Sequence, residues 1–202
     1  MNIYTYISKF YDLIDVFYFR NEMTSPRKAV LDSIPDGAIK VLDICTGTAT
    51  NSIHIAKGKK DSTVYAIDLS KEMLTVAKAK IAKEGITNLK TYVMDATSTK
   101  FPSQSFDVIL ISLVLHEIPV CLAERILAEA KRLLKPAGKL LIVEWEKPIS
   151  FPRKCMFQII SMIEPKGFKQ FLRTDFEDYF MSKGFRIRKE THCDYSRVYE
   201  LK

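Results

Sequence analysis

A buried apolar run that carries an acid as its next-to-last residue and leads into a loop of small residues constrains the fold of this chain most. The run IKVLDI (39–44) is followed by CTGTAT, which holds one glycine, Gly47, and a helical pattern begins at Thr50. The next apolar run, TVYAID, ends in an acid, Asp68, which lies 25 positions after Asp43. A strand, a tight loop, a helix and a second strand with an acid at its tip are typical of nucleotide-binding open α/β sheets.

Short apolar runs alternate with helical patterns along most of the chain, which favours parallel βαβ units. The predicted strands are rich in Val, Ile and Leu, as strands buried on both faces should be. They cover residues 39–44, 63–68, 89–94, 106–112 and 139–145. The helices between them are predicted at 50–58, 70–84 and 119–135, with Ser70 as an N-cap and a turn at Pro136-Ala137-Gly138.

The C-terminal end departs from this alternation. A helix over 175–183, stopped by Gly184, precedes two alternating runs, FRIRKET and YSRVYEL, that are expected to pair antiparallel at one edge of the sheet. The predicted fold is therefore a Rossmann-like doubly wound α/β sheet of seven strands, mostly parallel with an antiparallel C-terminal strand and helices on both faces. We expect one domain over 1–202. Its predicted parts are an N-terminal helical lid (1–35), a core (36–146), a cap (147–174) and a C-terminal helix and strand pair (175–202).

Composition excludes several classes of protein. No apolar run approaches the roughly 20 residues of a membrane span, and the N-terminus lacks a signal-peptide pattern. Four scattered cysteines form no CxxC pair, so neither zinc nor a disulfide framework is indicated, and no metal is expected. The net charge is +7 without a dense basic block, so no specific nucleic-acid partner is expected. A soluble, cytoplasmic protein, either a monomer or a homodimer, is the expectation.

Polar side chains lie at or next to the C-terminal ends of four predicted strands, at Asp43, Asp68, Asp95 and Ser112. Ligands of doubly wound sheets bind at the C-terminal ends of the strands. Asp68 is placed to accept hydrogen bonds from two ribose hydroxyls, and Asp95 could accept one from an adenine amino group. The backbone N–H groups that lead into the helix after Thr50 could hold a carboxylate.

The chain here resembles the class I S-adenosylmethionine-dependent methyltransferases, within them the branch of ubiquinone and menaquinone C-methyltransferases. The resemblance is carried by the loop at 43–49, by AIDLSKEML (66–74), by residues 94–119 and by LLKPAGKLLIVEW (133–145). It implies S-adenosylmethionine as cofactor and S-adenosylhomocysteine as product. The cofactor residues it implies include the loop for the methionine part, Asp68 for the ribose and Asp95 with Ala96 for the adenine. The full implied set is Asp43, Cys45, Thr46, Gly47, Asp68, Leu69, Met73, Asp95, Ala96 and Ser112.

The loop departs from the family pattern D-x-G-x-G-x-G at two positions. Cys45 and Ala49 replace the first and third glycines, and the Cys45 side chain is expected to narrow the space for the ligand. An NAD site would need G-x-G-x-x-G, a spacing that this loop lacks. An RNA methyltransferase is disfavoured because Ser112-Leu113-Val114-Leu115 stands where the adenine- and guanine-N-methylating families carry (Asn/Asp)-Pro-Pro-(Tyr/Phe).

Methyl transfer from a sulfonium is an in-line displacement that needs alignment and a dry site rather than a protein nucleophile. If the acceptor is a carbon or a cationic amine, a general base must remove a proton, and His116 is the leading candidate. Tyr11, in an aromatic N-terminal segment, is the candidate lid residue beside the methyl group. The acids Glu117, Glu144 and Glu146 are predicted to be structural or solvated.

The function predicted from these features is transfer of a methyl group to a small apolar or aromatic metabolite. Two alternatives stay open: a quinone or phospholipid methyltransferase at a membrane surface, and a non-catalytic protein that binds the cofactor or its product. The segment 148–174, which is apolar and flanked by basic residues, is either a cap over a hydrophobic or anionic acceptor, an interfacial helix or a core helix.

Overall fold

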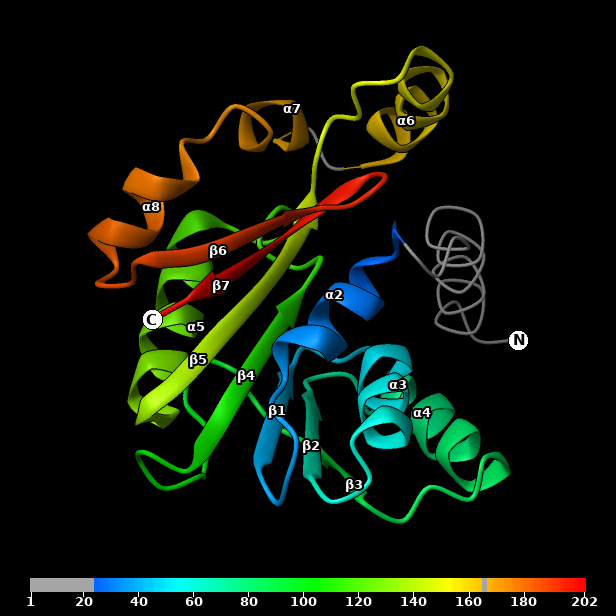
Figure 1. Ribbon diagram of the computed structural model, residues 1–202, viewed down its shortest axis with the longest axis vertical. Helices are drawn as coiled ribbons and strands as arrows, with labels where there is room; N and C mark the ends of the chain where they lie inside the picture. Colours follow the sequence, from blue (N-terminus) through cyan, green and yellow to red (C-terminus); the bar gives the residue numbers. More distant parts are fainter. Residues whose placement is uncertain (1–23, 165–166) are drawn as a thin grey trace.

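The computed structural model describes residues 24–164 and 167–202. Its centre is a seven-stranded sheet in the order β3-β2-β1-β4-β5-β7-β6, which Figure 1 shows with helices on both sides. The strands are β1 (Lys40–Ile44), β2 (Thr63–Asp68), β3 (Leu89–Val93), β4 (Phe106–Ser112), β5 (Leu134–Trp145), β6 (Ile187–His192) and β7 (Ser196–Leu201). The helices are α2 (Pro26–Ser33), α3 (Thr50–Gly58), α4 (Lys71–Lys83), α5 (Val120–Leu133), α6 (Phe151–Ile163), α7 (Phe168–Phe171) and α8 (Phe176–Ser182).

Strand pairing confirms the predicted topology. β1 to β5 pair in parallel, whereas β7 runs antiparallel to both β5 and β6. The strand order reverses between β1 and β4, because the chain passes from β3 at one edge back to the middle of the sheet. The C-terminal ends of β1, β2 and β4 therefore meet at the switch point where ligands of such sheets bind.

Alternate side chains of the central strands enter two separate cores. On one face Leu42, Ile109 and Ile142 pack with residues of α5 and α8. On the other face Val41 and Val108 pack with residues of α2 and α3. Burial on both faces explains why these strands are continuously apolar in the sequence.

The predicted helix ends are correct where a capping residue marks them. The side chain of Ser70 accepts a hydrogen bond from Met73 N and begins α4, and Asp175 caps α8 in the same way. The predicted end of the helix at 135 is wrong. α5 ends at Leu133, and residues 134–138 already belong to β5, since Leu134 pairs with Phe106. The turn predicted at Pro136-Ala137-Gly138 and the strand start predicted at 139 are therefore wrong as well. Pro136 contributes to this early end because it disfavours a helical conformation at Lys135.

Glu129 on α5 ties the segment after β3 to the helix layer. Its carboxylate accepts hydrogen bonds from Thr99 N and Oγ1 at 2.8 and 2.7 Å and from the guanidinium of Arg132. The bond from Arg132, together with those from Thr99, lowers the pKa of Glu129 to about 2. A lowered pKa means that the ionised carboxylate stabilises the fold at pH values above its ordinary pKa near 4.5.

We expect Glu129→Gln to lower the free energy of unfolding by about 1–3 kcal/mol at pH 7, because hydrogen bonds to a charged group are lost. The difference from the wild type should shrink as the pH falls from 4.5 toward 2, where the wild-type carboxylate also becomes protonated. Urea unfolding between pH 7 and pH 3 measures both quantities. Glu124→Gln, which alters an exposed pair with Lys183, is the control. A difference that stays constant with pH would contradict this account.

Candidate active site

The loop after β1 holds three residues in the left-handed backbone region. The φ angles are 56° at Cys45, 56° at Gly47 and 60° at Ala49. These are the positions of the three glycines in the family pattern, so Cys45 and Ala49 adopt a conformation that costs a non-glycine residue about 1–2 kcal/mol. Thr46 N donates to Ile67 O at 3.0 Å, which fastens the loop to β2. The loop therefore keeps the backbone shape of a glycine-rich turn despite two substitutions.

Asp43 lies inside the protein beneath this loop. Its Oδ2 accepts hydrogen bonds from Thr46 Oγ1 at 2.7 Å and from Ser52 Oγ on α3 at 2.5 Å. Burial raises the pKa of Asp43 to about 6, although both hydroxyl bonds act to lower it. The side chain thus links the loop to the first turn of α3. Ser52 was not among the predicted site residues, because no motif or spacing in the sequence marks it.

Asp68 connects the loop to the start of α4. Its two oxygens accept hydrogen bonds from Gly47 N and Ser70 N, both at 2.8 Å. Each carboxylate oxygen has a second lone pair, so Asp68 retains capacity for ligand hydroxyls. Leu69, the next residue, is 72% exposed, while Met73 is half-buried one turn into α4. An acid and an exposed apolar side chain thus stand together at the tip of β2.

Asp95 follows β3 at the same edge of the sheet. Its Oδ1 accepts hydrogen bonds from Thr97 N and Oγ1, both at 2.8 Å, and these bonds lower its pKa. Within the described residues, no hydrogen bond uses its Oδ2, so this oxygen can accept from a ligand amino group. Ala96 beside it is buried, and Ser112 is half-buried at the end of β4.

The chain turns sharply after β4 and presents backbone donors to an acid of β5. Leu113 has a φ of 56°, and Val114 N and Leu115 N donate to Oε1 of Glu144 at 3.2 and 2.8 Å. The other oxygen of Glu144 contacts His116 Nδ1 at 2.6 Å. Both side chains are 1% exposed. Glu144 is therefore the buried anchor that fixes the orientation of His116.

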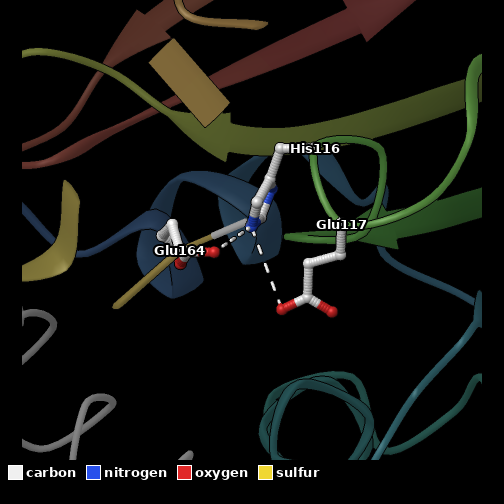
Figure 2. Close-up of side chains that lie close together, drawn as sticks. All are labelled: His116, Glu117 and Glu164. Atoms are coloured by element: carbon white, nitrogen blue, oxygen red, sulfur yellow. Dashed lines mark ion pairs between the residues drawn. The ribbon is translucent and has the colours of Figure 1, made fainter. Parts of the chain in front are cut away.

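Two further carboxylates lie near the other ring nitrogen of His116. Nε2 lies 3.3 Å from Oε2 of Glu164 and 3.9 Å from Oε1 of Glu117, and Figure 2 shows the three side chains converging. The rings of Phe168 and Phe171 pack against the imidazole at centroid distances of 5.5 and 5.8 Å. No sequence pattern pointed to Glu164, which is 48 positions from His116 and reaches it only through the placement of α6.

The electrostatics of His116 bear on its predicted role. Burial alone would lower the pKa of this imidazole, but the carboxylates of Glu144 and Glu164 outweigh it and raise the pKa well above the ordinary value. An imidazole that carries its proton donates rather than accepts one. The role of general base therefore stays a prediction, and it requires a change in the contacts of His116 when ligands bind.

Cys45 is the remaining loop residue with reactive chemistry. Burial, together with the charges of Asp68, Asp43, Asp95 and Glu117, raises the pKa of its thiol to about 12. The thiolate is therefore scarce at neutral pH, and a nucleophilic role for Cys45 is disfavoured.

We expect Cys45 to react with iodoacetamide at pH 7.5 at least about 100-fold more slowly than an exposed thiol, because each unit of pKa changes the thiolate fraction tenfold. Cys121 and Cys155, both exposed, serve as internal references. Mass spectrometry of peptides from a time course gives each rate. Labelling of Cys45 as fast as Cys121 would contradict the raised pKa.

The structure brings most of the predicted site residues to one edge of the sheet. Five regions meet there: the loop after β1, the tip of β2, the start of α4, the segment after β3 and the turn after β4. Tyr11 lies outside the described residues. The predicted site residues gathered at this edge are Asp43, Cys45, Thr46, Gly47, Asp68, Leu69, Met73, Asp95, Ala96, Ser112 and His116.

Comparisons with known proteins agree with this geometry. A family model described as a methyltransferase domain matches residues 41–138. Demethylmenaquinone methyltransferase of Geobacillus sp. (strain WCH70) is 30% identical over 182 residues, which cover 88% of this chain and 76% of the relative. A SAM-dependent methyltransferase from Aquifex aeolicus is similar in structure, with a TM-score of 0.70, 21% identity and coverage of 100% of this chain and 98% of that chain.

A second solved structure, phosphoethanolamine N-methyltransferase 2 of Haemonchus contortus in complex with S-adenosyl-L-methionine, has a TM-score of 0.59 and 22% identity. The match covers 79% of this chain and 36% of the Haemonchus enzyme. The two solved structures support the fold, and the identity to the curated relative over most of its length supports the family. The chain belongs to the class I S-adenosylmethionine-dependent methyltransferases, as the motifs at 43–49, 66–74 and 94–119 predicted.

Proposed function

We propose that this methyltransferase transfers the methyl group of S-adenosylmethionine to a small apolar or aromatic acceptor, and that a quinol-type ring is the leading acceptor class. The observation that carries the proposal is the meeting of Asp68, Asp95 and the loop at 45–49 at the strand ends. The names of relatives such as the Geobacillus enzyme support a quinol acceptor. Phe168 and Phe171 beside His116 supply apolar surface near the end of β4.

In this proposal each group has a separate task. The loop surrounds the methionine part, whose carboxylate lies on the N–H groups that lead into α3 after Thr50, while Asp68 holds the ribose hydroxyls and Asp95 the adenine amino group. Asp43 acts through Thr46 and Ser52, so it is a positioning residue. His116 stands on the acceptor side. The proposal keeps the four predicted parts of the domain. They are the lid (1–35), the core (36–146), the cap (147–174) and the C-terminal helix and strand pair (175–202).

The test is transfer of label from methyl-labelled S-adenosylmethionine to a panel of acceptors. The panel contains prenylated naphthoquinols, simple phenols, ethanolamine phosphates and phosphatidylethanolamine. We expect label in the organic extract with the quinols or phenols, and none with the amines. Tight cofactor binding without transfer to any acceptor would favour the alternative of a non-catalytic binding protein.

A second candidate, action at a membrane surface, is favoured by the outer face of α6. On α6 Phe151 is 78% exposed and Met162 84%, Ile149 just before the helix is 92% exposed, and the basic side chains of Arg153 and Lys154 are exposed on the same helix. Exposed apolar residues next to cations fit the boundary of an anionic bilayer. No helix in residues 24–164 and 167–202 has the length and apolar content to cross a membrane. The proposal is a peripheral contact through α6, and a cytoplasmic location is part of it.

We expect the double substitution Phe151→Ser and Met162→Ser to reduce co-sedimentation with anionic liposomes at least about 10-fold, because each apolar side chain contributes about 1.5–3 kcal/mol when it leaves water. Met181→Ser on α8, also an exposed methionine, is the matched control. Unchanged sedimentation of the double variant would assign α6 to a role away from membranes.

A further inference from the structure

Three potential metal ligands converge just beyond the end of β4. They are Nε2 of His116, a carboxylate oxygen of the adjacent Glu117 and one of Glu164, the C-cap of α6. All three atoms lie within 4.8 Å of one another. Figure 2 shows both carboxylates directed toward the same edge of the imidazole. Two elements far apart in the sequence thus bring one nitrogen and two oxygens to a single point.

The imidazole is held in the orientation that metal-binding histidines adopt. Its Nδ1 is fixed on Oε2 of Glu144 at 2.6 Å, which directs Nε2 toward Glu117 and Glu164. Nε2 is enclosed, and within the described part of the chain it makes no well-formed hydrogen bond, since its 3.3 Å contact with Oε2 of Glu164 is an ion pair only. Histidines that bind metals typically donate their second ring nitrogen to a carboxylate in this way. An enclosed ring nitrogen without a hydrogen bond is the position that a metal ion would use.

The local charge also favours a cation. Three carboxylates surround one imidazole, and within the described residues the ion pairs of Glu144 and Glu164 are with His116 alone. Glu144 and Glu164 are 1% and 12% exposed, so water screens them poorly. Even an imidazolium would leave this group with excess negative charge. A bound divalent ion would neutralise it.

We propose that His116, Glu117 and Glu164 bind one divalent transition-metal ion, with Glu144 orienting the histidine. One imidazole and two carboxylates suit Mn²⁺, Fe²⁺, Co²⁺ or Zn²⁺, whereas Ca²⁺ takes oxygen ligands. Ligand atoms around a tetrahedral ion at zinc distances lie about 3.4 Å apart. The 3.3 Å separation of His116 Nε2 from Oε2 of Glu164 already fits this value. Oε1 of Glu117 lies 3.9 Å from Nε2, and rotation of this partly exposed side chain would shorten that distance to the same value.

The position of this site relates it to the acceptor. The charge of Glu117 acts on the thiol of Cys45, so the cluster lies within electrostatic range of the cofactor loop. Three protein ligands leave coordination positions open, and an ion there would take a hydroxyl or enol oxygen of an acceptor. The inference goes beyond the proposed function, which needs no metal.

The experiment uses the full-length protein, treated with EDTA and dialysed, and titrates it with Mn²⁺ while free Mn²⁺ is followed by electron paramagnetic resonance. We expect one bound Mn²⁺ per chain, and affinity at least about 10-fold weaker in Glu164→Gln and in Glu117→Gln. These two variants preserve side-chain shape, and their folding is checked by circular dichroism. Glu146→Gln, which alters the contact of another glutamate with the exposed His192, should bind Mn²⁺ like the wild type.

Co²⁺ absorption spectra provide a second readout, because a ligand field of one nitrogen and two oxygens should appear in the wild type and change in Glu164→Gln. Absence of Mn²⁺ binding by the wild type, or equal binding by all variants, would overturn the proposal. In a parallel titration with ethanolamine, binding of this amine by a wild-type protein that does not bind Mn²⁺ would also overturn the proposal. It would assign the cluster to a cationic amine. Titration with S-adenosylmethionine in parallel separates failure of this site from failure of the cofactor site.

Discussion

Replacement of Glu144 by alanine is expected to lower the free energy of unfolding by about 3–5 kcal/mol, the typical cost of breaking a buried charged pair. The side chain of Glu144 is buried, and it accepts hydrogen bonds from Val114 N and Leu115 N while holding His116 at 2.6 Å. Its removal leaves two backbone N–H groups and one imidazole nitrogen buried without partners. For a chain of this size the melting temperature should fall by about 6–20 °C, which thermal circular dichroism measures.

Two further substitutions define what this loss means. Glu144→Gln keeps a carbonyl oxygen for the two N–H groups, so its loss should be smaller than that of the alanine variant. Glu200→Ala removes a partly exposed partner of Lys139 and should cost less than about 1 kcal/mol. A Glu144→Ala protein within about 1 kcal/mol of the wild type would show that the turn after β4 does not depend on this carboxylate.

Asp68→Ala is expected to weaken binding of S-adenosylmethionine at least about 100-fold, because two hydrogen bonds to a charged acceptor are each worth about 1.5–3 kcal/mol. The proposal assigns these bonds to the ribose hydroxyls. The variant also loses the contact of Gly47 N with Oδ2, which holds the loop against β2. Isothermal titration with S-adenosylmethionine and with S-adenosylhomocysteine measures the change.

The matched controls separate the charge from the shape. Asp68→Asn keeps an oxygen acceptor without the charge, so its affinity should lie between those of the wild type and Asp68→Ala. Asp107→Asn is the second control and should leave cofactor binding unchanged. Asp107 pairs with Lys135 near the start of β4, at the end of the strand away from the cofactor site. Wild-type affinity in a folded Asp68→Ala protein would remove the ribose assignment.

Much of the fold could be predicted because it depends on local patterns. The central strands are apolar on both faces, and Ser70 and Asp175 mark helix starts by accepting backbone hydrogen bonds. Parallel strands place their C-terminal ends at one edge of a sheet, so the positions of Asp68 and Asp95 at the ends of two apolar runs were enough to predict that they lie together.

The parts that could not be predicted depend on contacts between distant segments. The direction of Asp43 toward Ser52 follows from which face of β1 packs against α3. The approach of Glu164 to His116 follows from the packing of α6 through Phe157 and Ile160, and no spacing in the sequence encodes it. The expectation of no metal rested on cysteine spacing, which carries no information about a histidine and two glutamates that meet only in the fold.

A crystal structure of the protein with S-adenosylhomocysteine tests the central claim most directly. The account predicts the ribose hydroxyls on Asp68, the adenine amino group on Asp95 and the homocysteine carboxylate on the N–H groups that lead into α3 after Thr50. It also predicts that the sulfur faces the turn that carries His116. A ligand bound away from these strand ends, or with its ribose out of reach of Asp68, would contradict the account.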